Sequence, residues 1–189
     1  MYQKYHTEAI VLSSDARGEA DRVVALMTRD FGLVRARASA IRSESSKMRY
    51  AAQNFSYALV SLVKGKRGWR LAGASARTLP KSGQGLHAFA RISELTLRLV
   101  AGEEKNEYLF DVLSESHRAL MGAEREVVPT IEIVSVARIL FALGYISAEA
   151  LSTSLFTHTL YENDHLQEAE ILKETMLKSI NRAIAETHL

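Results

Sequence analysis

The sequence predicts an α+β protein in which a small β-barrel precedes an all-α helical bundle. Strand-like runs joined by short turns fill the first 79 residues, and helical periodicity fills the remainder. The charge divides near the same place: residues 1–81 carry 15 Lys and Arg against 6 Asp and Glu, whereas residues 82–189 carry 9 against 16. No strand–helix–strand alternation occurs, so a parallel sheet is not expected.

Within the first part, short apolar or alternating runs predict five strands, at residues 7–13, 20–29, 33–40, 55–64 and 69–76. Asp30-Phe31-Gly32 and Gly65-Lys66-Arg67-Gly68 have the composition of hairpin turns. The polar residues 41–52 predict a loop or short helix before the fourth strand. This count and spacing favour a closed five-stranded barrel of the OB type, with an SH3-like barrel or an open sheet as alternatives.

Pro80-Lys81-Ser82-Gly83-Gln84-Gly85 has the composition of a linker, so the predicted division is an OB-fold domain at 1–79 and a helical domain at 80–189. Apolar residues at helical spacing after the linker predict helices at 86–101, 104–121, 128–143 and 165–186, and a short helix around 148–154. Pro129 suits the first turn of the third of these, which is apolar nearly all round.

Several function classes lack support in the sequence. There is no Cys, which excludes disulfides, thiol nucleophiles and cysteine zinc sites. No segment has the length and apolarity of a membrane span, and no secretory signal is recognisable, so the expected location is the cytoplasm. The six histidines are scattered and no catalytic constellation has specific spacing, so neither a metal, a cofactor nor an enzyme activity is expected.

The basic residues of the barrel predict a nucleic-acid interface. Arg35 and Arg37 alternate with small apolar residues and therefore share one strand face, which in an OB barrel lies beside the turn between strands four and five. Trp69 or Tyr50 could stack on unpaired bases, although a place in the barrel core is the stronger interpretation for Trp69. The candidate nucleic-acid-binding residues are Arg35, Arg37, Arg42, Lys47, Arg49, Lys64, Lys66, Arg67, Trp69 and Arg70.

The same region resembles the RecO family of bacterial recombination mediators. The likeness covers roughly residues 5–77, with motifs in order at matching spacing, and is thinner beyond the linker. It rests on Thr7-Glu8-Ala9-Ile10-Val11-Leu12, Gly18-Glu19-Ala20-Asp21-Arg22-Val23-Val24, Thr28-Arg29-Asp30-Phe31-Gly32-Leu33-Val34-Arg35, Ser46-Lys47-Met48-Arg49, Phe55-Ser56 and Gly65-Lys66-Arg67-Gly68-Trp69-Arg70-Leu71.

The resemblance implies an N-terminal OB fold, a helical domain and a non-enzymatic role in DNA repair. It implies binding to single- and double-stranded DNA, strand annealing, and help in loading RecA with RecR onto strands coated by single-strand-binding protein. Many family members carry four cysteines after a segment similar to Leu143-Gly144-Tyr145, and this chain carries none. We therefore expect a zinc-less variant.

The resemblance also implies a site for the acidic tail of single-strand-binding protein. Arg91 and Arg98 lie two helical turns apart with Leu95 between them, which makes this face a candidate peptide site. Two other functions remain open from the residues: an OB-type RNA-binding protein, and an enzyme with a site between barrel and bundle. Competition between matched DNA and RNA strands and an activity screen discriminate them.

Overall fold

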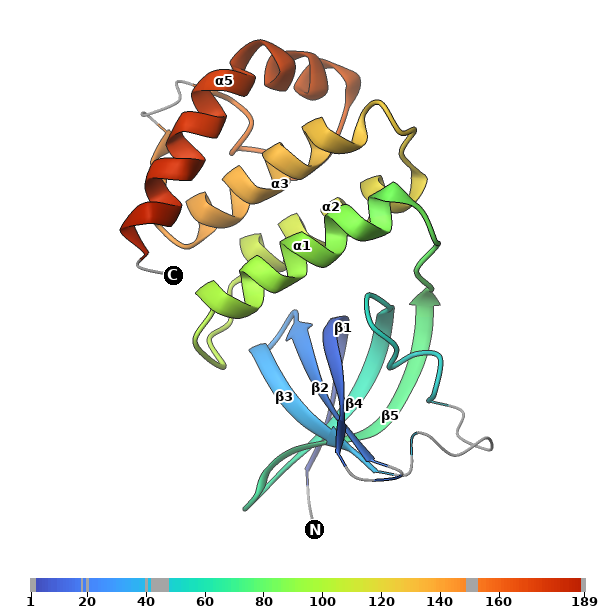
Figure 1. The fold of residues 1–189 in the computed structure, drawn as a ribbon. Helices are drawn as coiled ribbons and strands as arrows, with labels where there is room; N and C mark the ends of the chain where they lie inside the picture. The colour runs from blue at the N-terminus through green and yellow to red at the C-terminus, as the bar shows by residue number, and fades with distance from the viewer. Residues whose placement is uncertain are drawn as a thin grey trace. The chain divides into compact units, whose positions relative to one another are not determined.

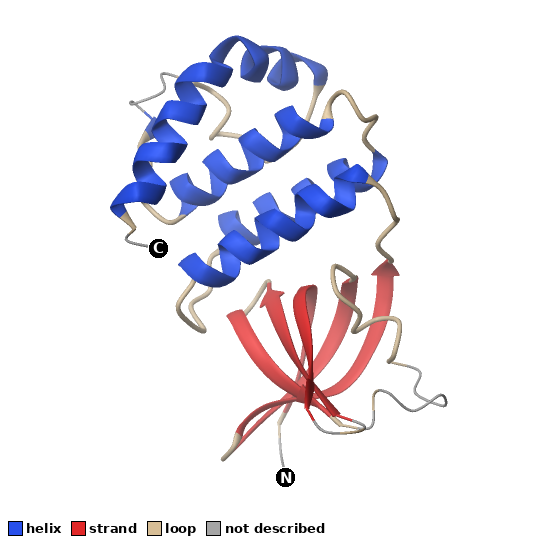
Figure 2. Cartoon of the chain, viewed as in Figure 1, coloured by secondary structure: helices blue, strands red, loops and turns tan. Residues whose placement is uncertain are grey.

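A computed structural model describes residues 3–17, 19, 21–39, 41, 48–148 and 153–187. The chain divides into two compact units, one of residues 1–81 and 101–107 and the other of residues 82–100 and 108–189. The strands lie in the first unit and are followed along the chain by helices (Figure 1, Figure 2). Residues 101–107 belong to the barrel unit, whereas the predicted boundary after residue 79 places them in the helical domain.

The barrel unit contains five strands that close into a barrel. They are β1 (Lys4–Arg17), β2 (Asp21–Thr28), β3 (Gly32–Ala38), β4 (Tyr57–Gly65) and β5 (Gly68–Thr78). The hydrogen-bonded order around the barrel is β1-β2-β3-β5-β4, and β1 pairs with β4 to close it. The β3–β5 pair is parallel and the others are antiparallel. This order confirms the predicted OB-type barrel and excludes the open sheet.

β1 is longer than the predicted run at 7–13 because it serves two neighbours. Its first half, Lys4–Ile10, pairs with β4, and Ala9–Arg17 pairs with β2, with an irregularity between Val11 and Ser13. A strand that changes partners must extend beyond its apolar centre, and its exposed ends carry no hydrophobic signal. The apolar pattern therefore located the strand but not its length.

The barrel core explains the alternation in β3. Val34, Ala36 and Ala38 are buried while Arg35 and Arg37 are exposed, as the period of two predicts. The same core includes Trp69, whose ring lies 5.7 Å from the ring of Tyr5 and 5.2 Å from that of Phe31. These edge and tilted contacts are the favoured geometries for aromatic pairs. β3 thus presents its arginines outward on a rigid, well-packed strand.

The predicted hairpin between β2 and β3 is present and is covered by residues 101–107. The Thr28 hydroxyl accepts a hydrogen bond from the Phe31 amide at 3.0 Å and donates one to the Gly32 carbonyl at 2.8 Å. Gly32 adopts a φ of 65°, and a Cβ there would meet the Glu104 carbonyl oxygen at 2.1 Å. Glycine is therefore required both by the turn and by the close approach of this segment.

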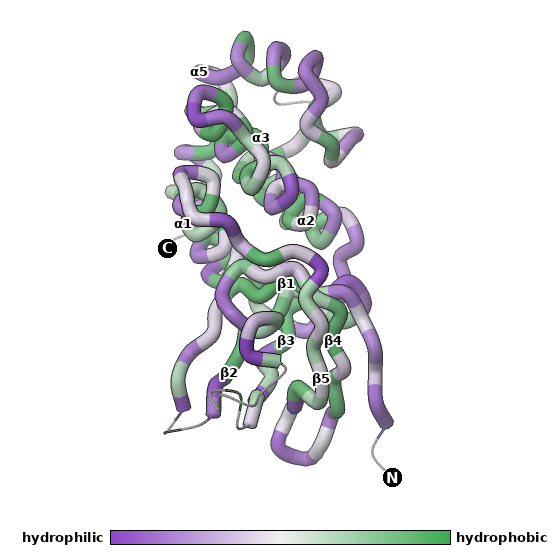
Figure 3. Tube along the Cα trace, turned by 90° about the vertical axis from the view of Figure 1, so that its right-hand side faces the viewer, coloured by the Kyte–Doolittle hydropathy of each residue, from purple (hydrophilic) through white to green (hydrophobic). Residues whose placement is uncertain are grey.

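The helical unit is built from α1 (Gln84–Leu99), α2 (Glu107–Gly122), α3 (Val128–Ala142) and α5 (Asn163–Glu186). The prediction that the second helix begins at Glu104 is wrong, because residues 101–106 are irregular, and Gly102 and Glu104 in this segment lie against the barrel hairpin. Most of the short helix predicted around 148–154 lies outside the described residues. In Figure 3, hydrophilic residues recur along α5 between hydrophobic ones, as expected of a surface helix.

The helix α3 is the centre of this unit and carries an unusual buried cation. The Arg138 side chain is 0% exposed. It donates hydrogen bonds to the carbonyl oxygens of Leu155 (2.8 Å), Thr159 (2.8 Å) and Leu160 (3.2 Å), and its guanidinium lies 4.8 Å from the centre of the Tyr161 ring. One guanidinium thus fixes the segment that connects α3 with α5.

Within the described part of the chain, no helix combines the length and the apolarity needed to cross a lipid bilayer.

Candidate nucleic-acid interface

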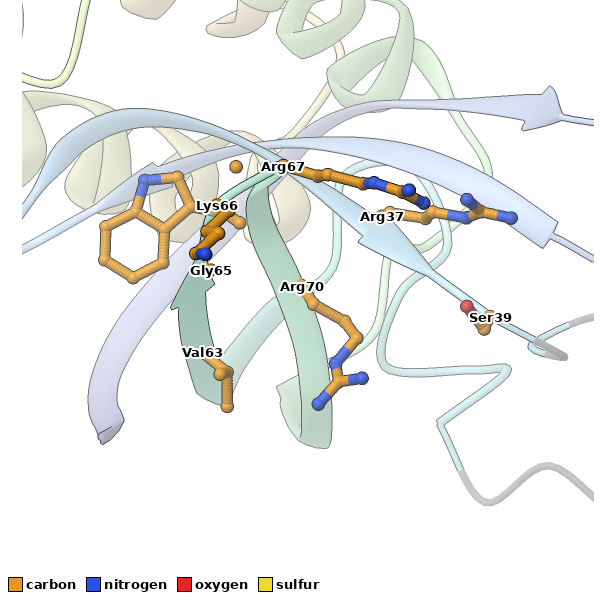
Figure 4. Close-up of a pocket in the computed structure, with 9 residues that line it drawn as sticks. Arg37, Ser39, Val63, Gly65, Lys66, Arg67 and Arg70 are labelled. Carbon is orange, nitrogen blue, oxygen red and sulfur yellow. The ribbon is translucent and has the colours of Figure 1, made fainter. Parts of the chain in front are cut away.

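A basic cavity of about 450 Å³ opens on the barrel between β3 and the β4–β5 turn. Among the described residues that line it, the charged ones are all cations: Arg37, Lys66, Arg67 and Arg70. Figure 4 shows the Arg37 and Arg67 side chains extending in the same direction, with Arg70 below them and Ser39 at the edge. We call these four cations and their cavity the arginine cavity. Its described lining residues are Arg37, Ser39, Val63, Gly65, Lys66, Arg67, Gly68, Trp69 and Arg70.

Strand pairing brings these cations together from distant parts of the sequence. The parallel β3–β5 contact places Arg37 opposite Arg70, and Ala36 opposite Trp69. The β4–β5 turn is closed by Gly68 with a φ of 92°, which leaves Lys66 and Arg67 at its tip. Several like charges on one concave surface create a positive potential that attracts a polyanion. The cavity is therefore suited to the phosphates of a nucleic-acid backbone.

Two of the predicted cations are already paired with carboxylates. Arg37 donates from Nε and Nη2 to Asp21 Oδ2, at 3.0 and 2.6 Å. Lys64 lies 2.8 Å from Glu103 Oε2 and 5.0 Å from the centre of the Trp69 ring, and it does not line the arginine cavity. The Lys64 ammonium holds the pKa of Glu103 below its usual range. Arg37 thus reaches the cavity with part of its charge neutralised. Lys64 instead contacts Glu103 and the Trp69 ring.

Trp69 lies in the barrel core rather than on a stacking surface. Its side chain is 6% exposed and is packed between Tyr5 and Phe31. The assignment of Trp69 as a base-stacking residue is therefore corrected, and the core interpretation describes its ring. Tyr50, the other aromatic residue considered, is 63% exposed.

The remaining predicted residues divide among three places. Arg35 is exposed on β3 outside the arginine cavity, and Arg49 lines a second cavity with Tyr50. Arg42 and Lys47 lie outside the described residues. Asp21, Arg22 and Ser39 were not selected from the sequence, although all three border the two cavities or their cations. The strand register pairs Arg22 with Ala38 and Val23 with Arg37, a long-range arrangement that no local sequence pattern shows.

The candidate peptide face on α1 belongs to the helical unit. Arg91 donates from Nε and Nη2 to the two carboxylate oxygens of Glu132 on α3, at 2.7 and 2.6 Å. Glu132 raises the pKa of Arg91 through this pair. Leu95 is half-buried and Arg98 is exposed. Arg91 therefore braces α1 against α3, whereas Arg98 lies exposed in the last turn of α1.

The possible metal ligands of the described residues are dispersed. Among the residues that the structure describes, no three His, Asp or Glu side chains come together as a metal site. The rings of His158 and His165 do stack at 5.5 Å, but only as a pair. A structural zinc needs four ligands, so this pair alone does not fit one.

The barrel matches the model of a known protein family. The family model described as "Recombination protein O N terminal" matches residues 1–75, which include β1 to β4 and most of β5. The barrel of this chain is therefore similar to the N-terminal part of RecO proteins. All ten residues proposed for nucleic-acid binding lie within the RecO match, whereas Arg91, Leu95 and Arg98 lie beyond it.

Curated RecO relatives extend this match to different degrees. The DNA repair protein RecO of Desulfitobacterium hafniense (strain DSM 10664 / DCB-2) is 42% identical over 62 residues, which are 33% of this chain and 23% of that protein. That of Dehalococcoides mccartyi is 39% identical over 62 residues, 33% of this chain and 24% of the relative. The RecO of Nocardioides sp. is 34% identical over 126 residues, 64% of this chain and 52% of the relative. The chain thus spans about half or less of the length of the curated relatives that it matches.

Proposed function

We propose that this chain is a non-enzymatic DNA-binding mediator of recombinational DNA repair, and that the arginine cavity holds the DNA backbone. The observation that carries the proposal is the convergence of Arg37, Lys66, Arg67 and Arg70 on one concave face of an OB-type barrel. The match of the barrel to the N-terminal RecO model, and its similarity to relatives named DNA repair protein RecO, support it.

The finer partners follow from the family resemblance and are part of the proposal. They are RecR, the acidic tail of single-strand-binding protein and, indirectly, RecA. For the tail peptide, Arg98 and Leu95 remain candidates on α1, with Arg91 held by Glu132. An acidic tail needs an apolar surface with cations at its rim, which this face offers on a smaller scale than the sequence alone indicates.

The test is a salt-dependent binding titration of the whole chain with single- and double-stranded DNA. If about five phosphates are neutralised, the logarithm of affinity for single strands falls with the logarithm of salt at a slope of about −3.5. Arg67→Ala combined with Arg70→Ala should weaken binding to all sequences about equally and make the slope shallower by about 1.4.

A matched control removes two exposed cations from α5 instead, through Lys178→Ala and Arg182→Ala. This control should bind DNA with the affinity and slope of the unaltered protein. A response that does not depend on salt, or an equal loss in both double variants, contradicts the proposal. Stronger binding of a matched RNA strand would favour the RNA-binding alternative instead.

A further inference from the structure

A second cavity on the barrel carries an exposed aromatic ring. It measures about 450 Å³ and is lined by Arg22, Ile41, Arg49, Tyr50, Ala52 and Gln53. Among the described residues that line it, the two charged ones, Arg22 and Arg49, are both cations. The Tyr50 side chain is 63% exposed, which makes it the most exposed aromatic side chain among the large exposed hydrophobic residues. An exposed aromatic ring in a cavity that is also lined by two cations favours an anionic, planar ligand.

The backbone under Tyr50 is held firmly although its ring is exposed. Its neighbours Ala51 and Ala52 are 3% and 2% exposed and belong to the barrel core. The Tyr50 carbonyl accepts hydrogen bonds from the Ser56 hydroxyl at 3.0 Å and the Gln53 amide at 3.4 Å. The ring is therefore displayed from an ordered turn, and a ligand that stacks on it pays little of the entropy of ordering that turn.

Each of the two cavities has a lining residue on the β2–β3 pair. Arg22 of the second cavity lies opposite Ala38, and Arg37 of the arginine cavity lies opposite Val23. Opposed residues of an antiparallel pair share a face, so Arg22 is on the face of the buried Ala38, whereas Arg37 is on the outer face. The Arg22 guanidinium donates to the Ser14 hydroxyl at 3.1 Å, a neutral partner that leaves its charge in place. The second cavity is therefore a cationic surface separate from the arginine cavity.

We propose that Tyr50 stacks on an unpaired base of a single strand bound at this second cavity. This inference rests on the proposed function, and it adds a basis for distinguishing single strands from duplexes. Bases inside a duplex are already stacked on one another, so only a single strand can place a base on the Tyr50 ring. Arg22 and Arg49 pair with the flanking phosphates, and the Gln53 amide faces the edge of the base.

The test compares Tyr50→Ala and Tyr50→Phe with the unaltered chain. The probes are oligothymidylate of about 15 nucleotides, within the range one OB fold covers, a duplex of the same length, and an oligomer of abasic sugar-phosphates. Tyr50→Ala should weaken binding to oligothymidylate by roughly 5- to 100-fold, the loss expected for one stacked base. Its affinities for the duplex and the abasic oligomer should stay within about twofold of those of the unaltered chain. Tyr50→Phe keeps the ring and should bind all three probes as the unaltered chain does.

Each outcome has a distinct meaning. An unchanged affinity of Tyr50→Ala for oligothymidylate overturns the stacking inference while salt-dependent binding still supports the proposed function. An equal loss on all three probes also overturns it, because it shows that Tyr50 acts on the shape of the barrel. Failure of the unaltered chain to bind any probe overturns both proposals.

Discussion

Asp21 determines how much of the Arg37 charge is available to a ligand. Both carboxylate contacts of Arg37 fall on Asp21 Oδ2, at the start of β2. A phosphate entering the arginine cavity must compete with this exposed ion pair, and exposed pairs of this kind contribute little stability. The pair therefore affects binding more than it affects folding.

Asp21→Asn is expected to strengthen DNA binding. Removing the carboxylate charge releases Arg37 toward phosphate, so affinity at low salt should rise about threefold to tenfold, the range given by 0.7 to 1.4 kcal/mol. The measurement is the same salt titration, with thermal unfolding as a check on the fold. Glu174→Gln, which removes one exposed negative charge from α5, is the control. Equal gains in the two variants would mean that net charge, and not the Asp21 pair, sets the affinity.

Arg138 acts at the same scale but serves stability. Replacing it with Met keeps the apolar stem and leaves the Leu155, Thr159 and Leu160 carbonyl oxygens without their donor. We expect the free energy of unfolding to fall by about 1–3 kcal/mol, the cost of leaving the buried Leu155 acceptor unsatisfied, because water can reach the part-buried Thr159 and Leu160 acceptors more readily. Urea denaturation measures this, with the exposed Arg182→Met as control. A loss below about 0.5 kcal/mol, the size of an ordinary surface substitution, contradicts this role.

Among the elements, β1 is tied to two neighbours by a polar cluster at one end of the barrel. Glu8 on β1 accepts a hydrogen bond from Tyr57 on β4 at 2.7 Å and pairs with Arg29, after β2, at 2.8 Å. The bonds from Tyr57 and then Arg29 lower the pKa of Glu8. Burial and then the Glu8 carboxylate raise the pKa of Tyr57 to about 12. Glu8 therefore stabilises the barrel above its ordinary pKa of 4.5, and this contribution is lost as the pH falls below that value.

The Tyr57 hydroxyl predicts a loss of stability in alkali. Between about pH 10 and 12 the folded chain keeps this proton and the unfolded chain releases it, so the free energy of unfolding decreases as the pH rises. Tyr57→Phe should lower the free energy of unfolding by about 0.5–1.5 kcal/mol at neutral pH. The free energy of unfolding of this variant should also decrease less steeply than that of the unaltered chain between about pH 10 and 12. Urea denaturation at several pH values measures both effects, with Tyr145→Phe as the exposed control. Parallel alkaline slopes for Tyr57→Phe and the unaltered chain would falsify this assignment.

Substitution of Gly32 in the β2–β3 hairpin and of Gly68 in the β4–β5 turn should lower the free energy of unfolding by different amounts. Gly32 and Gly68 both have positive φ, but only Gly32 lies against backbone, at Glu104. Gly68→Ala should cost about 1–2 kcal/mol, the penalty of the left-handed conformation alone. Gly32→Ala should cost more, because residues 101–107 must also move away from the hairpin. Denaturant titration of both variants gives the difference, and equal losses would show that residues 101–107 shift without cost.

For the whole molecule, the charge division follows the division into two units. The basic excess of residues 1–81 gathers on the barrel around two cavities, whereas the helical unit is acidic overall. The helical unit is held by apolar packing of α3 against α1 and α5 and by Arg138. Hydrophobic burial of this kind needs no metal to complete it.

The purified protein is accordingly expected to contain no stoichiometric zinc. The chain has no Cys, and zinc sites that support folding use several Cys or His ligands. Chelation should leave the thermal unfolding temperature unchanged, because no ligand-linked folding energy is removed. Elemental analysis and calorimetry with and without a chelator measure this. About one tightly held zinc per chain, or a lower unfolding temperature after chelation, contradicts the expectation.

The sequence by itself determined the strands, the helices and the OB class of this protein. Alternation in Val34 to Ala38 and helical periodicity after the linker are local signals, because each element buries one face. The composition also located the basic excess, and motif order along residues 5–77 carried the family resemblance. These properties depend on residues close together in the chain.

Only the tertiary structure decided which charges act together. The parallel β3–β5 contact brought Arg37 opposite Arg70, and the β2–β3 register placed Arg22 opposite the buried Ala38, in a separate cavity. The ion pairs join Arg37 to Asp21, Lys64 to Glu103 and Arg91 to Glu132. Trp69 is buried in the barrel core, whereas Tyr50 is exposed. Side-chain partners across a barrel depend on register and on long-range packing, which no local pattern contains.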